Sequence, residues 1–493
     1  MNNGVAVNAP APPTRGVSMA SGLVRPPLSA GVRLLYGLGS AATGGINRSL
    51  NAFLLLFYSQ VLGLPAAMAA SVIMVVTIFD AVVDPIVGRF SDNLRSRWGR
   101  RHPLMYAAAL PTSLAFFMLW RPPAGLAEAQ LAAYLLACLL LIRFTDTLFE
   151  LPSLSLAPEL TQRYDERSIL IAIRKGFEII GGYLFVIAGY QVFMREGSGG
   201  GLTSPEGYAA FGVFGGLFVL TVIIASTLGT RRFIPWLSGP SAGHDSIRSS
   251  LGEVRRTLLN APFLVMAATG MLYSTAVGIT QALSIYFNLF FWELSQSQVA
   301  LITTAQVPAS LFAVFVAPIA VRAFGKKAAT QVSTILGLLL VIAPVSLRLL
   351  GVLPTNGHPL IFPLLAVEAA VSHVFLVVGV VLIPSMLADV VEDVQVRTGR
   401  RSEGLIFAAE SVARKAVSGV GVFIAGIVLT VVDFPRKAHP GTVGVEHLRD
   451  LGLLWVCATV FFLTSAMVVV AFFPIDRRRH EDNLARIAAT EEK

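Results

Sequence analysis

The sequence predicts an all-α membrane protein with twelve transmembrane helices in two pseudo-symmetric halves of six. Three observations lead to this prediction. Of the 493 residues, 55% are hydrophobic and 14% are charged, whereas soluble domains carry about 25% charged residues. Apolar stretches of the roughly 20 residues needed to cross a bilayer recur along most of the chain. No series of polar linkers divides the chain into the roughly three domains that a soluble protein of this length would have, which excludes a soluble enzyme.

The apolar stretches predict helices because they are far longer than the roughly ten-residue alternating segments of a membrane β-barrel. Six of them precede a long polar connection and six follow it. The spans are expected at residues 32–62, 66–90, 103–120, 129–154, 168–194 and 208–229, and then at 262–291, 297–322, 327–350, 359–387, 403–432 and 447–474.

This pattern divides the chain into two halves, a connecting loop and two tails. Repeats of six spans around a central substrate site are an arrangement of secondary transporters. A short Pro-Ser pattern at Pro152 recurs at Pro384, which supports the division without establishing it. The expected parts are a flexible cytoplasmic tail at 1–30, the first half at 31–230, a cytoplasmic loop at 231–260, the second half at 261–475 and a cytoplasmic tail at 476–493.

Basic residues predict the orientation in the membrane. Arginines gather after the second span, in the central connection and in the last segment, at alternate ends of the spans. The excess of Lys and Arg on cytoplasmic loops places these ends, and both termini, in the cytoplasm. The same bias accounts for the net charge of +9 without nucleic acid as a partner. We therefore expect a multi-pass protein of the cell membrane.

Asp80 and Asp84 in the second span are the most informative residues. A charged side chain within a span is costly unless it faces a protein interior or a water-filled cavity. Residues four apart share one helix face, and two adjacent carboxylates favour a bound cation or a shared proton. Oxygen ligands suit a hard cation such as Na⁺. The alternative is a structural role, with one carboxylate at the helix break at Pro85 and the other paired with a buried arginine.

Other polar residues within the spans are candidates for the same site or for a central cavity. Asp146 is expected to pair with Arg143, whereas Thr147 and Glu150 face an ion or a polar solute. Cationic partners of the carboxylates would compete with the ion. The remaining candidates are Arg174 in the fifth span, Glu410 and Lys415 in the eleventh, Arg48 and Asn51 in the first, and Gln281 and Asn288 in the seventh. Glu368 and His373 in the tenth span stay ambiguous between an interhelical hydrogen bond and a proton relay.

Three segments resemble a known family. Residues 80–103 read Asp-Ala-Val-Val-Asp-Pro-Ile-Val-Gly-Arg-Phe-Ser-Asp-Asn-Leu-Arg-Ser-Arg-Trp-Gly-Arg-Arg-His-Pro. This segment resembles the second-span and loop signature of the glycoside–pentoside–hexuronide:cation symporters, the melibiose permease family of the major facilitator superfamily. Residues 152–174 and 387–415 are similar to that family's fourth-to-fifth and tenth-to-eleventh segments.

The resemblance implies roles for individual residues. Asp80, Asp84 and Thr147 would coordinate the coupling cation, and Glu150 would bind sugar hydroxyls near that ion. Arg174 would lie near the sugar, and Lys415 would interact with the second-span carboxylates. One departure matters: Gly44 stands where sugar-specific members have an aspartate. The family's lysophospholipid-carrying branch therefore remains an alternative.

The sequence thus predicts a secondary active transporter and not an enzyme. The expected activity is Na⁺- or H⁺-coupled symport of a sugar or glycoside-like solute by alternating access. We expect it to function as a monomer in the bilayer, with no cofactor beyond the coupling ion. The alternatives are a cation-coupled carrier of a lysophospholipid or other amphiphile and a non-transporting membrane sensor or scaffold. From Asp92, Arg95, Arg100 and Arg101 we expect a cytoplasmic gate, which would hold the inner ends of the halves together through ion pairs when the cavity faces outward.

Overall fold

The computed structural model describes residues 28–161, 163–195, 201–237, 260–398 and 403–491, and these ranges contain helices and no strand. Most of the predicted N-terminal tail and of the central loop lies outside the described residues. The first half contains α1 (Ala30–Leu38), α2 (Ser40–Ser49), the π-helical turns η1 (Leu50–Leu54) and η2 (Phe57–Val61), α3 (Ala66–Asn93), α4 (His102–Leu119), α5 (Glu128–Leu160), α6 (Tyr164–Ala188), η3 (Gly189–Phe193), α7 (Pro205–Thr230) and η4 (Arg231–Trp236).

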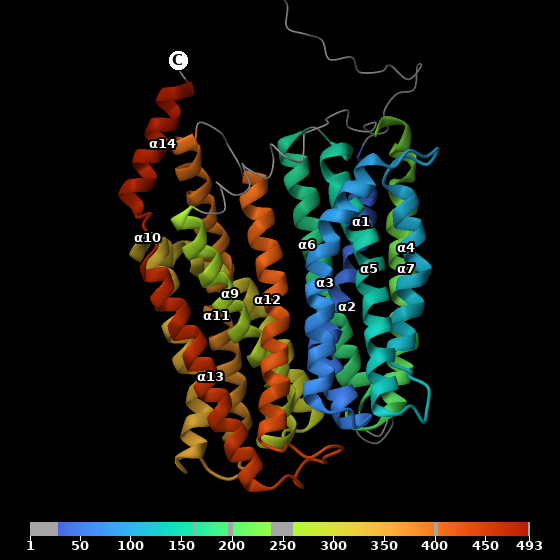
Figure 1. Cartoon of the computed structure of the whole chain (residues 1–493), viewed down its shortest axis with the longest axis vertical. Coiled ribbons are helices and arrows are strands. Elements are labelled where there is room, and N and C mark those ends of the chain that lie inside the picture. The colour runs from blue at the N-terminus through green and yellow to red at the C-terminus, as the bar shows by residue number, and fades with distance from the viewer. Residues whose placement is uncertain (1–27, 162, 196–200, 238–259, 399–402, 492–493) are drawn as a thin grey trace, which may run out of the picture.

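The second half and the C-terminal segment are also helical. Their elements are α9 (Ala261–Tyr286), η5 (Phe287–Phe291), α10 (Gln296–Leu349), α11 (Ile361–Thr398), α12 (Glu403–Val431), α13 (Val445–Ala471) and α14 (Arg477–Glu491). In Figure 1, α1 to α7 form one side of the molecule and α9 to α14 the other, and α12 stands beside the first side. Contacts between α12 and α3 join the two sides.

Nine helices in the described ranges are long and apolar enough to cross a membrane, compared with the twelve spans predicted. The first predicted span is divided among α1, α2, η1 and η2. The fifth, α6, carries Arg174, Lys175 and Glu178 in its middle. The eighth and ninth are continuous in α10, where Gly325 interrupts the helical backbone with φ = 78°, a value that favours glycine. The count of twelve stays a prediction.

Helices within each half approach closely through glycine. A Cβ built on Gly44 of α2 would lie 1.9 Å from the carbonyl oxygen of Glu178 in α6. In the second half, a Cβ on Gly421 of α12 would lie 2.6 Å from the carbonyl oxygen of Thr275 in α9. Small residues allow such backbone contact between membrane helices. The pairs α2–α6 and α9–α12 are therefore packed backbone against backbone.

Hydrogen bonds join the halves at one end of the bundle. The hydroxyl groups of Ser59 in η2 and Tyr286 in α9 are 2.5 Å apart, and the Gln60 side-chain oxygen accepts from the Ala438 backbone N–H at 3.1 Å. Arg436 pairs with Glu128 at 2.7 Å. This end lies opposite α14 (Figure 1).

The C-terminal segment, predicted only as a tail, forms α14 and contacts α11. Arg479 donates two hydrogen bonds to Oδ1 of the buried Asp393, at 2.7 and 3.1 Å. His480 Nδ1 lies 2.8 Å from Glu392 Oε2 and 3.4 Å from Asp389 Oδ1. The segment is therefore an ordered part of the second half.

Candidate functional site

Asp80 and Asp84 lie on the face of α3 that meets the second half. The Lys415 ammonium on α12 is 2.5 Å from Asp84 Oδ2 and 3.6 Å from Asp80 Oδ2. Val82 and Ile86, on the opposite face of α3, are 57% and 62% exposed on the bundle surface. The carboxylates therefore point inward, as their cost in a membrane requires.

Thr147 of α5 completes this acidic cluster, which we define as Asp80, Asp84, Thr147 and Lys415. The buried Thr147 hydroxyl is 3.1 Å from Asp84 Oδ1 and 3.5 Å from Asp80 Oδ1. Carboxylate and hydroxyl oxygens are ligands for a hard cation. The Lys415 ammonium provides the positive charge in this structure, so a cation bound to the same oxygens would compete with it.

Glu150 and Arg174 lie beside the acidic cluster, deeper in the first half. Arg174 is buried, donates to Ser153 Oγ at 2.5 Å, and lies 5.6 Å from the centre of the Tyr36 ring. Glu150 is within electrostatic range of both Lys415 and Arg174. Neither Glu150 nor Arg174 is among the residues that line the central cavity described below. Their roles in binding a solute stay predictions.

One expected pairing in the spans is wrong. Asp146 accepts a hydrogen bond from Thr43 Oγ1 at 2.9 Å, and Arg143 donates to the Asn47 side-chain oxygen. Both find partners on α2, which packs within reach of α5, so the expected Arg143–Asp146 ion pair does not form.

Glu410 pairs with Arg414 at 3.2 Å and does not join Lys415 in the acidic cluster. Positions five apart on a helix point in directions roughly 140° apart. The predicted role of Glu410 in coupling stays a prediction.

A cavity of about 270 Å³ lies between the halves. Its walls include the four residues predicted for the solute from the first and seventh spans, which are Arg48, Asn51, Gln281 and Asn288. Most of the remaining lining belongs to the second half, from α9, α10, α11 and α13. The structure thus brings together Arg48, Asn51, Gln281 and Asn288 but places them apart from the acidic cluster.

Glu368 and His373 of α11 also line the cavity, although sequence reasoning left them ambiguous. His373 Nε2 is 2.9 Å from Ser310 Oγ, and Glu368 Oε1 is buried without a hydrogen-bond partner. With Ser372, they are polar residues that line the cavity from an otherwise apolar helix. Polar residues in an apolar span were the available signal in the sequence.

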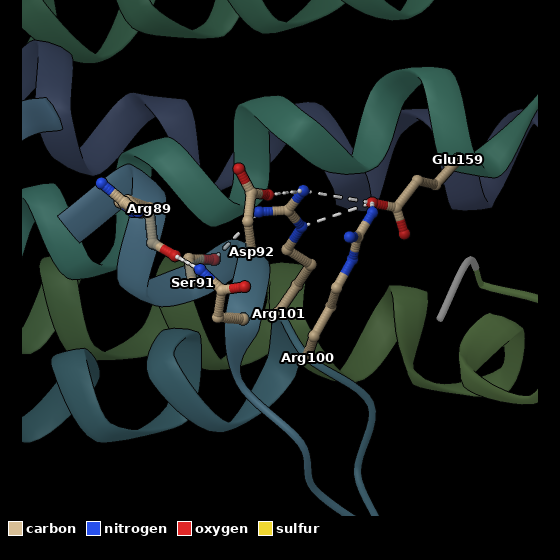
Figure 2. Close-up of polar contacts among 7 residues, drawn as sticks. Arg89, Ser91, Asp92, Arg100, Arg101 and Glu159 are labelled. Carbon is tan, nitrogen blue, oxygen red and sulfur yellow. Dashed lines mark hydrogen bonds and ion pairs between the residues drawn. The ribbon is translucent and has the colours of Figure 1, made fainter. Parts of the chain in front are cut away.

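The predicted cytoplasmic gate forms ion pairs within the first half (Figure 2). Arg101 binds Asp92 Oδ1 at 2.7 Å and Glu159 Oε1 at 3.3 Å, and Arg100 binds the same Glu159 oxygen at 2.5 Å. Arg95 is exposed. Among the described residues these pairs stay within the first half, because the Glu159 carboxylate at the end of α5 binds both arginines. The expectation that they hold the two halves together when the cavity faces outward stays a prediction.

The long apolar helices and the cavity between two helical sides define a multi-pass membrane protein, and the comparison with known families shows that it is a transporter and not an enzyme. A family model described as MFS/sugar transport protein matches residues 35–477, and the chain belongs to this family. The resemblance to the glycoside–pentoside–hexuronide symporters is confirmed.

Individual relatives match nearly the whole chain. An uncharacterized symporter from Synechocystis sp. is 26% identical, with 93% of this chain and 97% of the relative covered. The isoprimeverose transporter of Lactiplantibacillus pentosus is 22% identical, with 90% and 88% covered. The crystal structure of a point mutant of the nucleoside transporter NupG superposes with a TM-score of 0.62 at 14% identity, covering 90% of this chain and all of that one. At this identity the last likeness shows the fold alone.

Proposed function

We propose that the chain is a secondary active transporter that couples entry of Na⁺ or H⁺ to uptake of a sugar or glycoside-like solute. The observation that carries the proposal is the acidic cluster, in which carboxylates of the first half face an ammonium of the second. Span carboxylates that face a protein interior commonly belong to ion pathways. The names of the two relatives, a symporter and an isoprimeverose transporter, support the same activity.

The cluster offers a physical basis for coupling. Lys415 and a cation compete for the oxygens of Asp80 and Asp84, so binding of the cation releases the ion pair between α3 and α12. Because that pair joins the halves, its release changes how strongly they are held together near the cavity. This link suits alternating access, in which one half moves against the other around a central site.

The proposal also includes the membrane topology, the oligomeric state and the chemistry of the cavity. We place twelve spans in two six-helix halves in the cell membrane, with both termini cytoplasmic and the monomer as the working unit. The polar side chains of Arg48, Asn51, Gln281 and Asn288 in the cavity suit a hydroxylated solute. The lysophospholipid alternative and the non-transporting scaffold gain no support from the relatives.

Uptake into proteoliposomes containing the full chain tests the proposal. The panel contains glycosides, pentosides, uronides and lysophospholipids, each assayed under an inward Na⁺ gradient, an inward proton gradient or no gradient. We expect one gradient to drive accumulation of a sugar above its equilibrium level, and an ionophore to abolish it. Uptake that is the same with and without either gradient, or accumulation of a lysophospholipid alone, would contradict the proposal.

A further inference from the structure

Two ionisable residues of opposite sign line the cavity without an ion-pair partner. Arg48 of α2 places its guanidinium 4.4 Å from the centre of the Tyr183 ring, and Glu368 of α11 has a buried oxygen without a hydrogen bond. In the described ranges neither side chain forms an ion pair with the other or with any other residue. Unpaired charges within a membrane protein are costly and point to a functional site.

The first half cannot supply its own acid to the cavity at Gly44. Any side chain there would meet the Glu178 carbonyl oxygen, because α2 and α6 are in backbone contact. Glu150 lies beside the acidic cluster and does not line the cavity. Glu368 is therefore the carboxylate that faces this space, and it comes from the second half.

His373 lines the same cavity as the two charged residues. It stands just over one turn after Glu368 on α11 and lies within electrostatic range of Arg48. Its ring nitrogen is already engaged with Ser310. Arg48, Glu368 and His373 thus line one volume between the halves.

We infer that Arg48 and Glu368 together bind a neutral, polyhydroxylated solute, with one of the two residues on each half. We call this pair of residues the clamp. Arg48 donates hydrogen bonds to solute oxygens, and Glu368 accepts them from solute hydroxyls. Charge-assisted hydrogen bonds are stronger than neutral ones, so both charges are compensated without a net charge on the solute. A carboxylate on the solute would bind Arg48 but would leave Glu368 unpaired beside a second anion. This inference rests on the proposed function and names the residues that select its solute.

The clamp also joins the halves through the solute. Arg48 belongs to the first half and Glu368 to the second, so a solute that binds both spans the interface. The acidic cluster, formed by α3, α5 and α12, responds to the cation instead. Solute selectivity and ion dependence should therefore change independently when the two sites are mutated.

Equilibrium binding to the purified full chain tests the clamp. The probes are methyl β-D-glucoside with methyl β-D-glucuronide, and methyl β-D-galactoside with methyl β-D-galacturonide, which differ within each pair at C6. We expect the wild type to prefer a neutral member, and Glu368→Gln to weaken its binding about tenfold and strengthen binding of the uronide. The half-saturating cation concentration should not change. Glu446→Gln, an exposed acid at the start of α13, is the matched control and should alter none of these values.

Arg48→Gln provides the second test if Glu368→Gln does not fold. It should weaken binding of the neutral glycoside and of the uronide, because both use the guanidinium. The clamp is wrong if the wild type prefers the uronides or binds neither neutral glycoside, or if Glu368→Gln alters both members of a pair equally. Gradient-driven uptake that persists with such a result would leave the proposed function standing. Glu368-dependent binding without any gradient-driven uptake would instead reject the proposed function.

Discussion

Gly44 shows how one residue sets the distance between two helices. The absence of a side chain lets α2 rest against the α6 backbone, where a Cβ would be 1.9 Å from the Glu178 carbonyl oxygen. The neighbouring atom belongs to the backbone, so a larger residue cannot be relieved by a rotamer change. The aspartate expected from the family at this position is therefore excluded by packing.

Replacing Gly44 with Ala should destabilise the protein by about 1 to 3 kcal/mol, the usual cost of overpacking. The measurement is thermal unfolding of the purified protein in detergent. Gly176→Ala, within the partner helix α6, is the control because a Cβ there meets nothing within 4 Å, and it should be neutral or slightly stabilising. An unchanged unfolding temperature for Gly44→Ala would show that α2 and α6 can separate without cost.

The sequence was sufficient to place some residues at the cavity and not others. Arg48, Asn51, Gln281 and Asn288 are polar residues in apolar spans, and they line the cavity as expected. Glu368 and His373 have the same kind of sequence context, but an interhelical hydrogen bond was an equally good explanation. Whether Glu368 and His373 line the cavity depends on which face of α11 points toward it. That rotation is set by packing against the other helices, and the sequence of α11 alone does not give it.

Among the elements, α14 best shows how a polar segment becomes part of a membrane bundle. Arg479 binds Asp393, whose side chain is 3% exposed. Arg397 also pairs with Asp393, at 2.9 Å from the same helix. The Asp393 carboxylate, near the C-terminal end of α11, thus pairs with two arginines, and its pair with Arg479 attaches α14 to α11.

Arg479→Ala should lower the free energy of unfolding by about 1 to 2 kcal/mol, since it removes hydrogen bonds to a buried charge while Arg397 remains. Arg477→Ala is the matched control on the same helix, because Arg477 and its partner Glu481 are both exposed and such pairs contribute little. Thermal unfolding of the two variants gives the comparison. Equal effects would mean that α14 is not held by the Asp393 pair.

Elements differ in how far the sequence predicts them. The boundary between the eighth and ninth predicted spans coincides with the break at Gly325, because glycine and charged residues interrupt the apolar pattern there. The irregular first span was not predicted, since π-helical turns carry no periodicity of their own. The docking of α14 was also missed, because its partners on α11 lie more than eighty residues earlier in the chain.

At the scale of the whole molecule, the described ion pairs divide into two kinds. Those of Arg100 and Arg101 stay within the first half, and those of Arg479 and Lys326 stay within the second. The pairs of Lys415 with Asp80 and Asp84, and the exposed pair of Arg436 with Glu128, cross between the halves. A cation that displaces Lys415 would therefore act on an interface between two separately reinforced bodies.

The sequence predicted the family and the residues of the acidic cluster, because charges inside spans are rare and stand in recognisable motifs. It did not predict that Arg100 and Arg101 pair with Glu159 inside one half. Basic residues near a membrane surface satisfy the positive-inside rule wherever their partners lie. Pairing across or within the halves depends on their relative position, which the pattern of residues does not carry.

Solute-driven cation flux tests the central claim most directly. Proteoliposomes containing the wild type or Asp84→Asn are loaded with a cation indicator, and the sugar identified in the uptake panel is added outside. The account predicts that the sugar drives inward cation flux in the wild type, and that Asp84→Asn abolishes both this flux and sugar accumulation while the protein remains folded. Full accumulation with an unchanged cation flux in Asp84→Asn would contradict it.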